Sequence, residues 1–450
     1  MTSPSLRLWR SLRRLPARLI VAQPNTPPDV FKGLALFWVD GLFIAFSYSF
    51  YNPFLPLFLL GFGANNSQVG LMTGASSLLG ILSYMAAMRA THAIGGRQRI
   101  VVFSRASRLM LLLVALVPFA VPRAASIPVT IALVALQVTL ENLGSPAWTA
   151  LVADIVPLEG RARYIASRST VKNLTRTIGV AAAGQLIRAL GFPSGYSASF
   201  VLGGLLGLSA GIAYAHIPMR QEQPHDYQAA TAGRDLLSNK RLLLYMGART
   251  LWTFGYQMAA PFYAVYVVRN LGGDARLVGL LTGAGSMAAI AGLMLYGPLV
   301  ERLGMRRSWL LSSLADISVP LLWLVARSGW FGLLPYALDG ALMAGLEVVN
   351  LNTLLVLTDA RQRTQFAAVT STILSLATLA GPLFGGALSD RVGFGPVFVL
   401  AAALSLVGCV LYYLFVPEPR LQMTDTGTSR PMAGCSPASA SLPTPGELRE

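Results

Sequence analysis

The sequence predicts an all-α membrane protein whose twelve transmembrane helices form two pseudo-symmetric six-helix bundles. Three observations lead to this prediction: an apolar composition, twelve long apolar runs and an internal repeat. Of the 450 residues, 54% are hydrophobic and only 12% are charged. Soluble domains carry about 25% charged residues, so this composition indicates a protein embedded in a membrane.

The apolar runs have the length that a membrane-spanning helix requires. Such a helix needs about 20 mostly apolar residues, whereas barrel strands would show alternating segments of about ten. The runs of the first half lie near residues 33–60, 68–88, 100–122, 126–152, 168–190 and 195–217. Those of the second half lie near 242–268, 277–299, 308–327, 331–357, 365–388 and 394–416. We therefore expect six helices, a polar stretch and six more helices.

Composition divides the chain into five predicted regions. A basic segment (1–30) precedes the first bundle (31–217), and a polar cytoplasmic linker (218–240) separates it from the second bundle (241–418). Residues 419–450 are rich in Ser, Thr, Pro and Gly, so they are expected to form a disordered tail. The basic segment fits either a helix lying on the bilayer surface or a transit segment.

The net charge of +16 would also fit a nucleic-acid-binding protein, but the positive residues follow membrane topology. With the N-terminus in the cytoplasm, the outer loops and outer helix ends contain only six of the 35 Lys and Arg: Arg123, Arg188, Arg269, Arg276, Arg327 and Arg391. This positive-inside asymmetry predicts a multi-pass protein of the inner cell membrane with both termini in the cytoplasm. It argues against a nucleic-acid partner.

Two octapeptides identify the internal repeat. GLMTGASS at 70–77 and GLLTGAGS at 279–286 agree in six of eight positions and lie 209 positions apart. The same offset places Gly95 on Gly304. Several matches in the same order indicate that the two halves are copies, as in membrane proteins built from parallel repeats about an axis along the membrane normal.

With this organisation, residues 31–418 resemble the major facilitator superfamily. The most specific part of the resemblance is GPLVERLGMRR at 297–307, which matches the family's loop signature with Glu in place of the usual Asp. In the family this loop forms a charge network that stabilises one conformation. The resemblance implies such a conformational latch for Gly297, Glu301, Arg302, Gly304, Arg306 and Arg307. The equivalent first-half loop has His92 where the acid is expected, so a plain basic loop is the alternative there.

Ionisable residues deep in membrane helices are costly unless paired or hydrated, so each is a functional candidate. The offset of 209 places Asp40 on Arg249, and an offset of 206 places Glu141 on Glu347. The resemblance implies that their helices, the first, fourth, seventh and tenth, surround a central cavity. A carboxylate there can couple a proton to a substrate, and an arginine can bind a substrate anion. The alternative is a structural ion pair. Asp316 and Asp339 are expected to be a packing or gating partner and a hydrated outer group, respectively.

Polar and aromatic residues accompany these charges. They are Tyr48, Asn142, Trp252, Tyr256, Gln257 and Asn350. Such a lining suits an amphipathic organic solute, because aromatic rings stack and amides orient the ligand. Packing against lipid or other helices is the alternative for any single aromatic residue.

No catalytic or metal-binding pattern is evident in the sequence. GLSAG at 207–211 matches a nucleophile-elbow string, but it lies inside an apolar run and not between a strand and a helix. There is no Walker lysine motif and no zinc-spaced set of His and Cys. Cys409 and Cys435 lie in different regions and predict no disulfide framework. We expect no enzyme activity, no cofactor and no bound metal.

These observations predict a secondary active transporter of a small organic solute, working by alternating access as a monomer in the lipid bilayer. Proton coupling through Glu141 or Asp40 is favoured, so Glu141→Gln should keep the fold and abolish pH-driven accumulation. Aromatic lining favours efflux of an amphipathic compound, whereas Arg249 and the missing antiporter signature on the fifth helix favour uptake of a small polar or anionic nutrient. A transport-inactive receptor or scaffold is the alternative from another class.

Overall fold

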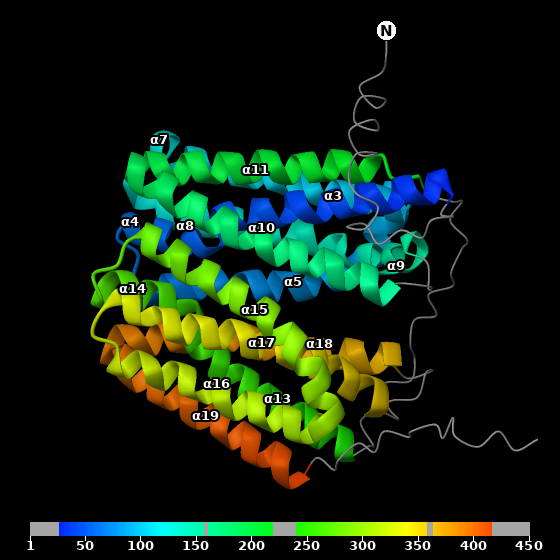
Figure 1. Ribbon diagram of the computed structural model, residues 1–450. Coiled ribbons are helices and arrows are strands. Elements are labelled where there is room, and N and C mark those ends of the chain that lie inside the picture. The colour runs from blue at the N-terminus through cyan, green and yellow to red at the C-terminus, as the bar shows by residue number, and fades with distance from the viewer. Residues whose placement is uncertain (1–26, 157–160, 219–239, 358–362, 416–450) are drawn as a thin grey trace, which may run out of the picture.

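The computed structural model describes residues 27–156, 161–218, 240–357 and 363–415. Within these ranges every regular element is a helix (Figure 1). The basic segment, the linker and the C-terminal tail that the sequence predicts lie almost entirely outside the described residues.

The first half contains the helices that correspond to the first six predicted spans. They are α3 (Pro28–Tyr51) with α4 (Leu55–Gly61), α5 (Asn66–Ile94), α6 (Arg97–Arg105) with α7 (Leu109–Ala120), α8 (Arg123–Leu143) with α9 (Ser145–Ile155), α10 (Arg161–Leu190) and α11 (Ser194–Ala215). Short 3-10 turns join two of these pairs, η1 (Asn52–Phe54) and η2 (Ala106–Arg108).

The second half repeats this order. Its helices are α13 (Lys240–Ala259) with α14 (Tyr263–Asn270), α15 (Ala275–Leu303), α16 (Met305–Val325), α17 (Leu333–Leu357), α18 (Arg363–Val392) and α19 (Phe394–Phe415). The 3-10 turn η3 (Ala260–Phe262) joins α13 to α14, and η4 (Gly329–Gly332) precedes α17.

A proline interrupts the first helix of each half. Pro53 lies in η1 and Pro261 lies in η3. Each breaks the α-helical hydrogen-bond pattern, because proline has no backbone N–H to donate. These prolines are 208 positions apart, so the repeat here runs at 208 and not at 209. The shift corrects one sequence-based equivalence: Asp40 corresponds to Ala248 and not to Arg249, and Tyr48 corresponds to Tyr256.

Helix length and apolarity confirm a multi-pass membrane protein. Within the described ranges, eight helical segments are long and apolar enough to span a membrane. They are Pro28–Gly61, Arg97–Ala120, Arg123–Thr149, Ser194–Ala215, Ala275–Val300, Arg306–Val325, Ile373–Val392 and Phe394–Phe415. The other predicted spans correspond to α5, α10, α13 with α14, and α17. The total of twelve therefore remains a prediction.

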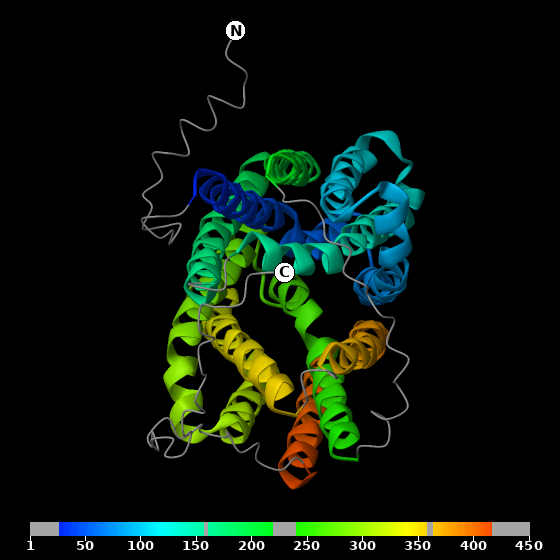
Figure 2. The same cartoon turned by 90° about the vertical axis from the view of Figure 1, so that its right-hand side faces the viewer.

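The helices gather into two groups that follow the chain. α3 packs on α10 and α11, while α13 packs on α18 and α19. Figure 2 shows the first half above and the second half below. The main contacts between the groups are α5 with α18 and α10 with α15, and α4 also contacts α14. We call the end of the molecule that contains α4 and α14, on the left in Figure 1, the closed end.

The repeated octapeptide lies where the halves meet. A Cβ atom added to Gly70 of α5 would lie 2.2 Å from the carbonyl oxygen of Pro382 on α18. A Cβ atom added to Gly279 of α15 would lie 2.5 Å from the carbonyl oxygen of Val180 on α10. Glycine is required at both positions because helix backbones approach this closely only without side chains between them. The two copies of the octapeptide thus serve the two equivalent contacts between the halves.

Polar bonds reinforce the closed end. Asp390 at the end of α18 accepts hydrogen bonds from the backbone N–H groups of Asn66 (2.9 Å) and Ser67 (2.8 Å). These are the first residues of α5, whose N–H groups have no partner within their own helix. Arg269 donates to the Asn66 side chain at 2.6 Å. The start of the second predicted span is therefore held by the second half of the chain.

Candidate functional site

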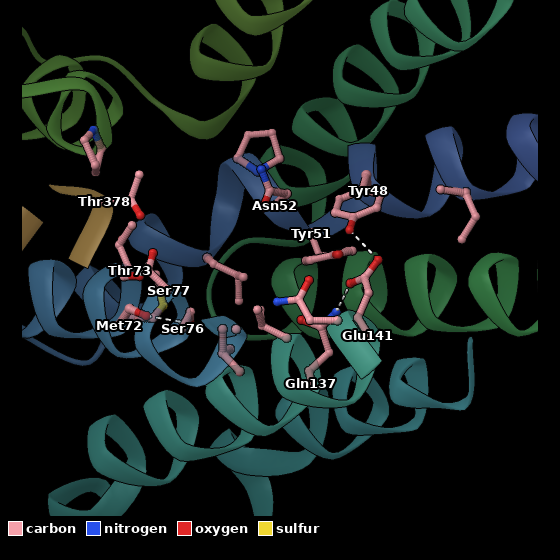
Figure 3. Close-up of a pocket in the computed structure, with 18 of the residues that line it drawn as sticks. Tyr48, Tyr51, Asn52, Met72, Thr73, Ser76, Ser77, Gln137, Glu141 and Thr378 are labelled. Carbon is pink, nitrogen blue, oxygen red and sulfur yellow. Dashed lines mark hydrogen bonds between the residues drawn. The ribbon is translucent and has the colours of Figure 1, made fainter. Parts of the chain in front are cut away.

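A cavity of about 920 Å³ lies between the two halves. Its wall on one side includes residues of α3, α4, α5, α6, α8, α9 and α10, and on the other side residues of α13, α14, α15, α17 and α18. Figure 3 shows part of this wall, with Tyr48, Gln137 and Glu141 on one side of the view and Thr73 and Thr378 on the other. Trp148 of α9 also lines the cavity, and α9 lies at the end opposite the closed end (Figure 1).

Glu141 stands at the centre of a polar cluster in the first half. Arg108 donates to both carboxylate oxygens, at 2.8 Å and 2.7 Å. Tyr48 donates its hydroxyl and Gln137 donates its amide (2.9 Å) to the same carboxylate. Arg108 is only 1% exposed and lies over the Tyr48 ring. A bidentate pair of this kind is among the stronger side-chain interactions, so the charge of Glu141 is balanced within its own half.

Asp40 is fully buried, with 0% of its surface exposed. Its carboxylate pairs with Arg105 at 3.1 Å and with Arg168 at 3.2 Å. Asp40 does not reach the cavity wall, but both of these arginines do. One carboxylate thus holds two guanidinium groups, which leaves an excess positive charge beside the cavity.

A stripe of basic residues on α10 was not identified from the sequence. Arg168, Lys172 and Arg176 are spaced four residues apart and all line the cavity. Residues at this spacing lie on one face of a helix. The spacing was visible in the sequence and was the signal that could have identified them.

The two acids of the second half, Asp339 and Asp316, have different partners from Glu141 and Asp40. Tyr256 lines the cavity and donates its hydroxyl to Asp339 on α17 at 3.1 Å. Asp316 on α16 is 3% exposed, and its Oδ1 atom has no hydrogen-bond partner in the described part of the chain. The two acids lie close enough for their charges to interact, and Asp339 also interacts with Arg176 of the first half. Neither acid forms an ion pair with any described residue of its own half.

The other predicted site residues differ in whether they line the cavity. Asn142 and Gln257 line the cavity together with Tyr48, Glu141 and Tyr256. Trp252 packs in the core of the second half between Tyr256 and Trp309. Arg249 lies away from the cavity wall and reaches the Tyr245 hydroxyl at 3.4 Å, and Asn350 accepts from Trp309 at 3.2 Å. The side chain of Glu347 is outside the described part of the structure.

The predicted latch is only partly described. Gly304 adopts a φ of 79° immediately before α16, a conformation that favours glycine. Arg306 donates to the carbonyl oxygen of Tyr413 and lies over its ring, while Arg302 and Arg307 are exposed. Nothing is described for the side chain of Glu301 or around Gly297. A charge network in this loop therefore remains a prediction.

The sequence profile of the Major Facilitator Superfamily matches residues 38–256 and 245–437, which together cover most of the chain. The chain belongs to the major facilitator superfamily. The resemblance inferred from GPLVERLGMRR and from the repeat is thus confirmed. Two curated relatives match only part of the chain. They are multidrug resistance proteins, and their matches are local.

The multidrug resistance protein MdtG of Citrobacter koseri is 33% identical over 172 residues, which are 37% of this chain and 42% of the relative. MdtG of Serratia proteamaculans is 36% identical over 124 residues, which are 27% of this chain and 30% of the relative. The chain thus matches less than half the length of each of these superfamily members.

Solved structures of the superfamily share the fold over nearly their whole length. A bacterial homologue of the human lysosomal transporter Spinster, in an inward-facing and unoccupied conformation, gives a TM-score of 0.64 at 17% identity, covering 87% of this chain and 98% of that chain. A D-xylose–proton symporter gives 0.66 at 14% identity, covering 86% and 97%. These likenesses confirm the predicted all-α fold of two bundles.

Proposed function

We propose that this superfamily member is a secondary active transporter that moves a small organic solute across the inner cell membrane by alternating access. The observation that carries the proposal is the cavity between two repeat-related halves, which glycine contacts and polar bonds join at the closed end. A site in this position is exposed to one side or the other when one half rocks against its partner.

The charge asymmetry of the sequence assigns both termini to the cytoplasm. α3 begins at the end opposite the closed end (Figure 1). Under this assignment the closed end faces outward, and the structure represents an inward-facing state. Outward opening would separate Gly70 from Pro382 and Gly279 from Val180.

We place the coupling proton on Asp339 and Asp316, and not on Glu141 or Asp40 as the sequence suggested. Glu141 and Asp40 are already engaged in ion pairs with arginines of their own half. Asp339 is connected to the cavity by Tyr256. The titratable and charged groups around the two acids are Tyr256, Tyr263, Tyr296, Tyr336, Cys409 and, from the first half, Arg176.

Efflux is the favoured direction. The MdtG relatives are named multidrug resistance proteins, and Tyr48, Trp148 and Tyr256 supply an aromatic wall. Uptake of an anionic nutrient is the second candidate, because α10 places Arg168, Lys172 and Arg176 on the cavity wall.

A disulfide that locks the closed end tests alternating access directly. Ser67 and Asp390 lie in hydrogen-bond contact across the two halves, so the double variant Ser67→Cys, Asp390→Cys should form a disulfide under oxidation. In proteoliposomes with a pH gradient, we expect the oxidised protein to stop moving a fluorescent aromatic solute and the reduced protein to regain the activity. The two single variants are the matched controls. Undiminished transport by the fully oxidised double variant would contradict the proposal.

A further inference from the structure

The charged side chains of the cavity wall are mostly positive. Arg105, Arg168, Lys172 and Arg176 line it, whereas Glu141 is the acid among the described wall residues. Glu141 is already balanced by Arg108, which lies behind the wall and is nearly fully buried. The surface presented to a solute therefore carries an excess of positive charge.

The three residues of α10 extend this charge along the cavity. A helix rises 1.5 Å per residue, so successive members of the stripe are about 6 Å apart along its axis. Arg168 is partly engaged by Asp40, a carboxylate that it shares with Arg105. Arg176 is exposed, and its guanidinium has no hydrogen bond or ion pair with any described residue. Asp339 of the other half influences it only through longer-range charge interaction.

Apolar surface lies beside the stripe. Tyr48, Trp148, Tyr256 and Tyr336 belong to the same wall. Aromatic side chains offer ring faces to a flat organic group, and guanidinium groups bind carboxylate, sulfonate or phosphate oxygens with two parallel hydrogen bonds. A solute that satisfies both features has an aromatic or otherwise apolar body and a negative group.

We propose that the cavity binds amphipathic organic anions, with the anionic group on Arg176 and Lys172 of α10 and the apolar body against the aromatic wall. This inference rests on the proposed transport function and names its substrate class. It also bears on direction, because outward movement of an anion is electrically downhill across a membrane that is negative inside.

Three probes that share a naphthalene ring and differ in charge test the inference. They are 2-naphthalenesulfonate, neutral 2-naphthyl glucoside and the quaternary cation (2-naphthylmethyl)trimethylammonium. Binding to the purified full chain in detergent is measured by calorimetry. We expect the sulfonate to bind more tightly than the other two, and its affinity to fall as salt is raised, since salt screens charge interactions.

The variant Arg176→Gln should weaken sulfonate binding about tenfold, which is the effect expected of one lost charge-assisted contact. Arg176→Lys, which keeps the charge, should restore most of the affinity. Arg163→Gln is the matched control, because Arg163 is an exposed arginine of the same helix that does not line the cavity. If Arg176→Gln does not yield folded protein, Lys172→Gln serves the same purpose.

Preference for the cation in the wild type, or equal sulfonate affinity in Arg176→Gln and Arg163→Gln, would overturn the inference. The same probes in proteoliposomes separate this result from the transport proposal. Transport of the cation with exclusion of the sulfonate would refute the anion site and leave the transporter intact. Tight, Arg176-dependent sulfonate binding without movement of any probe would support the anion site and count against transport.

Discussion

The two halves of the molecule are related by a repeat, yet they hold their buried charges in opposite ways. Gly96, and not Gly95 as the offset of 209 implied, precedes α6 as Gly304 precedes α16. This shared start places Arg108 of the first half on Asp316 of the second. Tyr48 likewise corresponds to Tyr256. Each tyrosine donates to an acid, but within the described ranges a guanidinium pairs with that acid only in the first half.

This difference suggests that the halves divide the work of the site. A carboxylate that accepts two bonds from Arg108 is fixed in its charge and its geometry. In the second half, Asp339 accepts a hydrogen bond from Tyr256, and Asp316 Oδ1 has no hydrogen-bond partner among the described residues. Under the proposed coupling, the first half provides a rigid wall and the second half provides the group that exchanges the proton.

The largest expected effect tests whether the arginine of the first half is structural. Arg108→Gln should destabilise the fold by about 3–5 kcal/mol, because it leaves the largely buried Glu141, only 18% exposed, without its cation. Glu141→Gln should also lower stability, contrary to the sequence-based expectation that this variant keeps the fold. Asp316→Asn should be neutral or stabilising. Thermal unfolding in detergent measures all three, and equal losses for Arg108→Gln and Asp316→Asn would remove the contrast between the halves.

The next largest effect is expected on the coupling of transport to protons. Asp339→Asn should abolish pH-driven accumulation while leaving the protein folded, because an amide retains the hydrogen bond from Tyr256 but cannot exchange a proton. Accumulation by proteoliposomes with and without a pH gradient is the measurement. Asp29→Asn is the control, since Asp29 is an exposed acid at the start of α3. Gradient-driven accumulation that persists when Asp339 and Asp316 are both replaced would show that the proton binds elsewhere.

A smaller effect is expected where the halves touch. Gly279→Ala should oppose packing of α15 on α10 by about 1–3 kcal/mol, the usual range for an overpacked contact. The closed end should then open in more molecules. Gly247→Ala is the matched control, because nothing lies within 4 Å of the added Cβ there. Distances between spin labels at Asn65 and Arg391 report the opening, and identical distributions in the two variants would argue against a glycine-dependent closure.

The smallest effect concerns the polar bonds of the closed end. Asp390→Asn keeps the size of the side chain but removes a carboxylate that caps the start of α5. We expect a loss of about 1 kcal/mol, as for other capping residues. Thermal unfolding should show this loss in Asp390→Asn and no loss in Arg391→Gln, its exposed neighbour.

Much of the architecture could be predicted from the sequence because membrane helices leave a strong local signal. Runs of about 20 apolar residues follow from the thickness of the bilayer, and the octapeptides at 70–77 and 279–286 revealed the repeat. The matching octapeptides did not give the offset between the two halves for every helix. The offset of 209 holds for α5 and α15, whereas the proline turns η1 and η3 set it to 208 for the preceding helices.

The candidate site was less predictable because pairing depends on which helices touch. The sequence identified Tyr48, Glu141, Asn142, Tyr256 and Gln257, all of which line the cavity. It also proposed Arg249 and Trp252, whose helix turns them toward the core of the second half. It did not identify Arg168, Lys172 and Arg176, although their four-residue spacing is present in the sequence.

The sequence by itself determined the membrane location, the helical fold, the repeat and the superfamily, because each of these follows from local composition and order. Only the tertiary structure decided which acid is neutralised and which is not. Arg108 and Glu141 are 33 positions apart, and Arg176 and Asp339 belong to different halves. The charge state of a buried group depends on its neighbours in space, and helix packing alone brings those neighbours together.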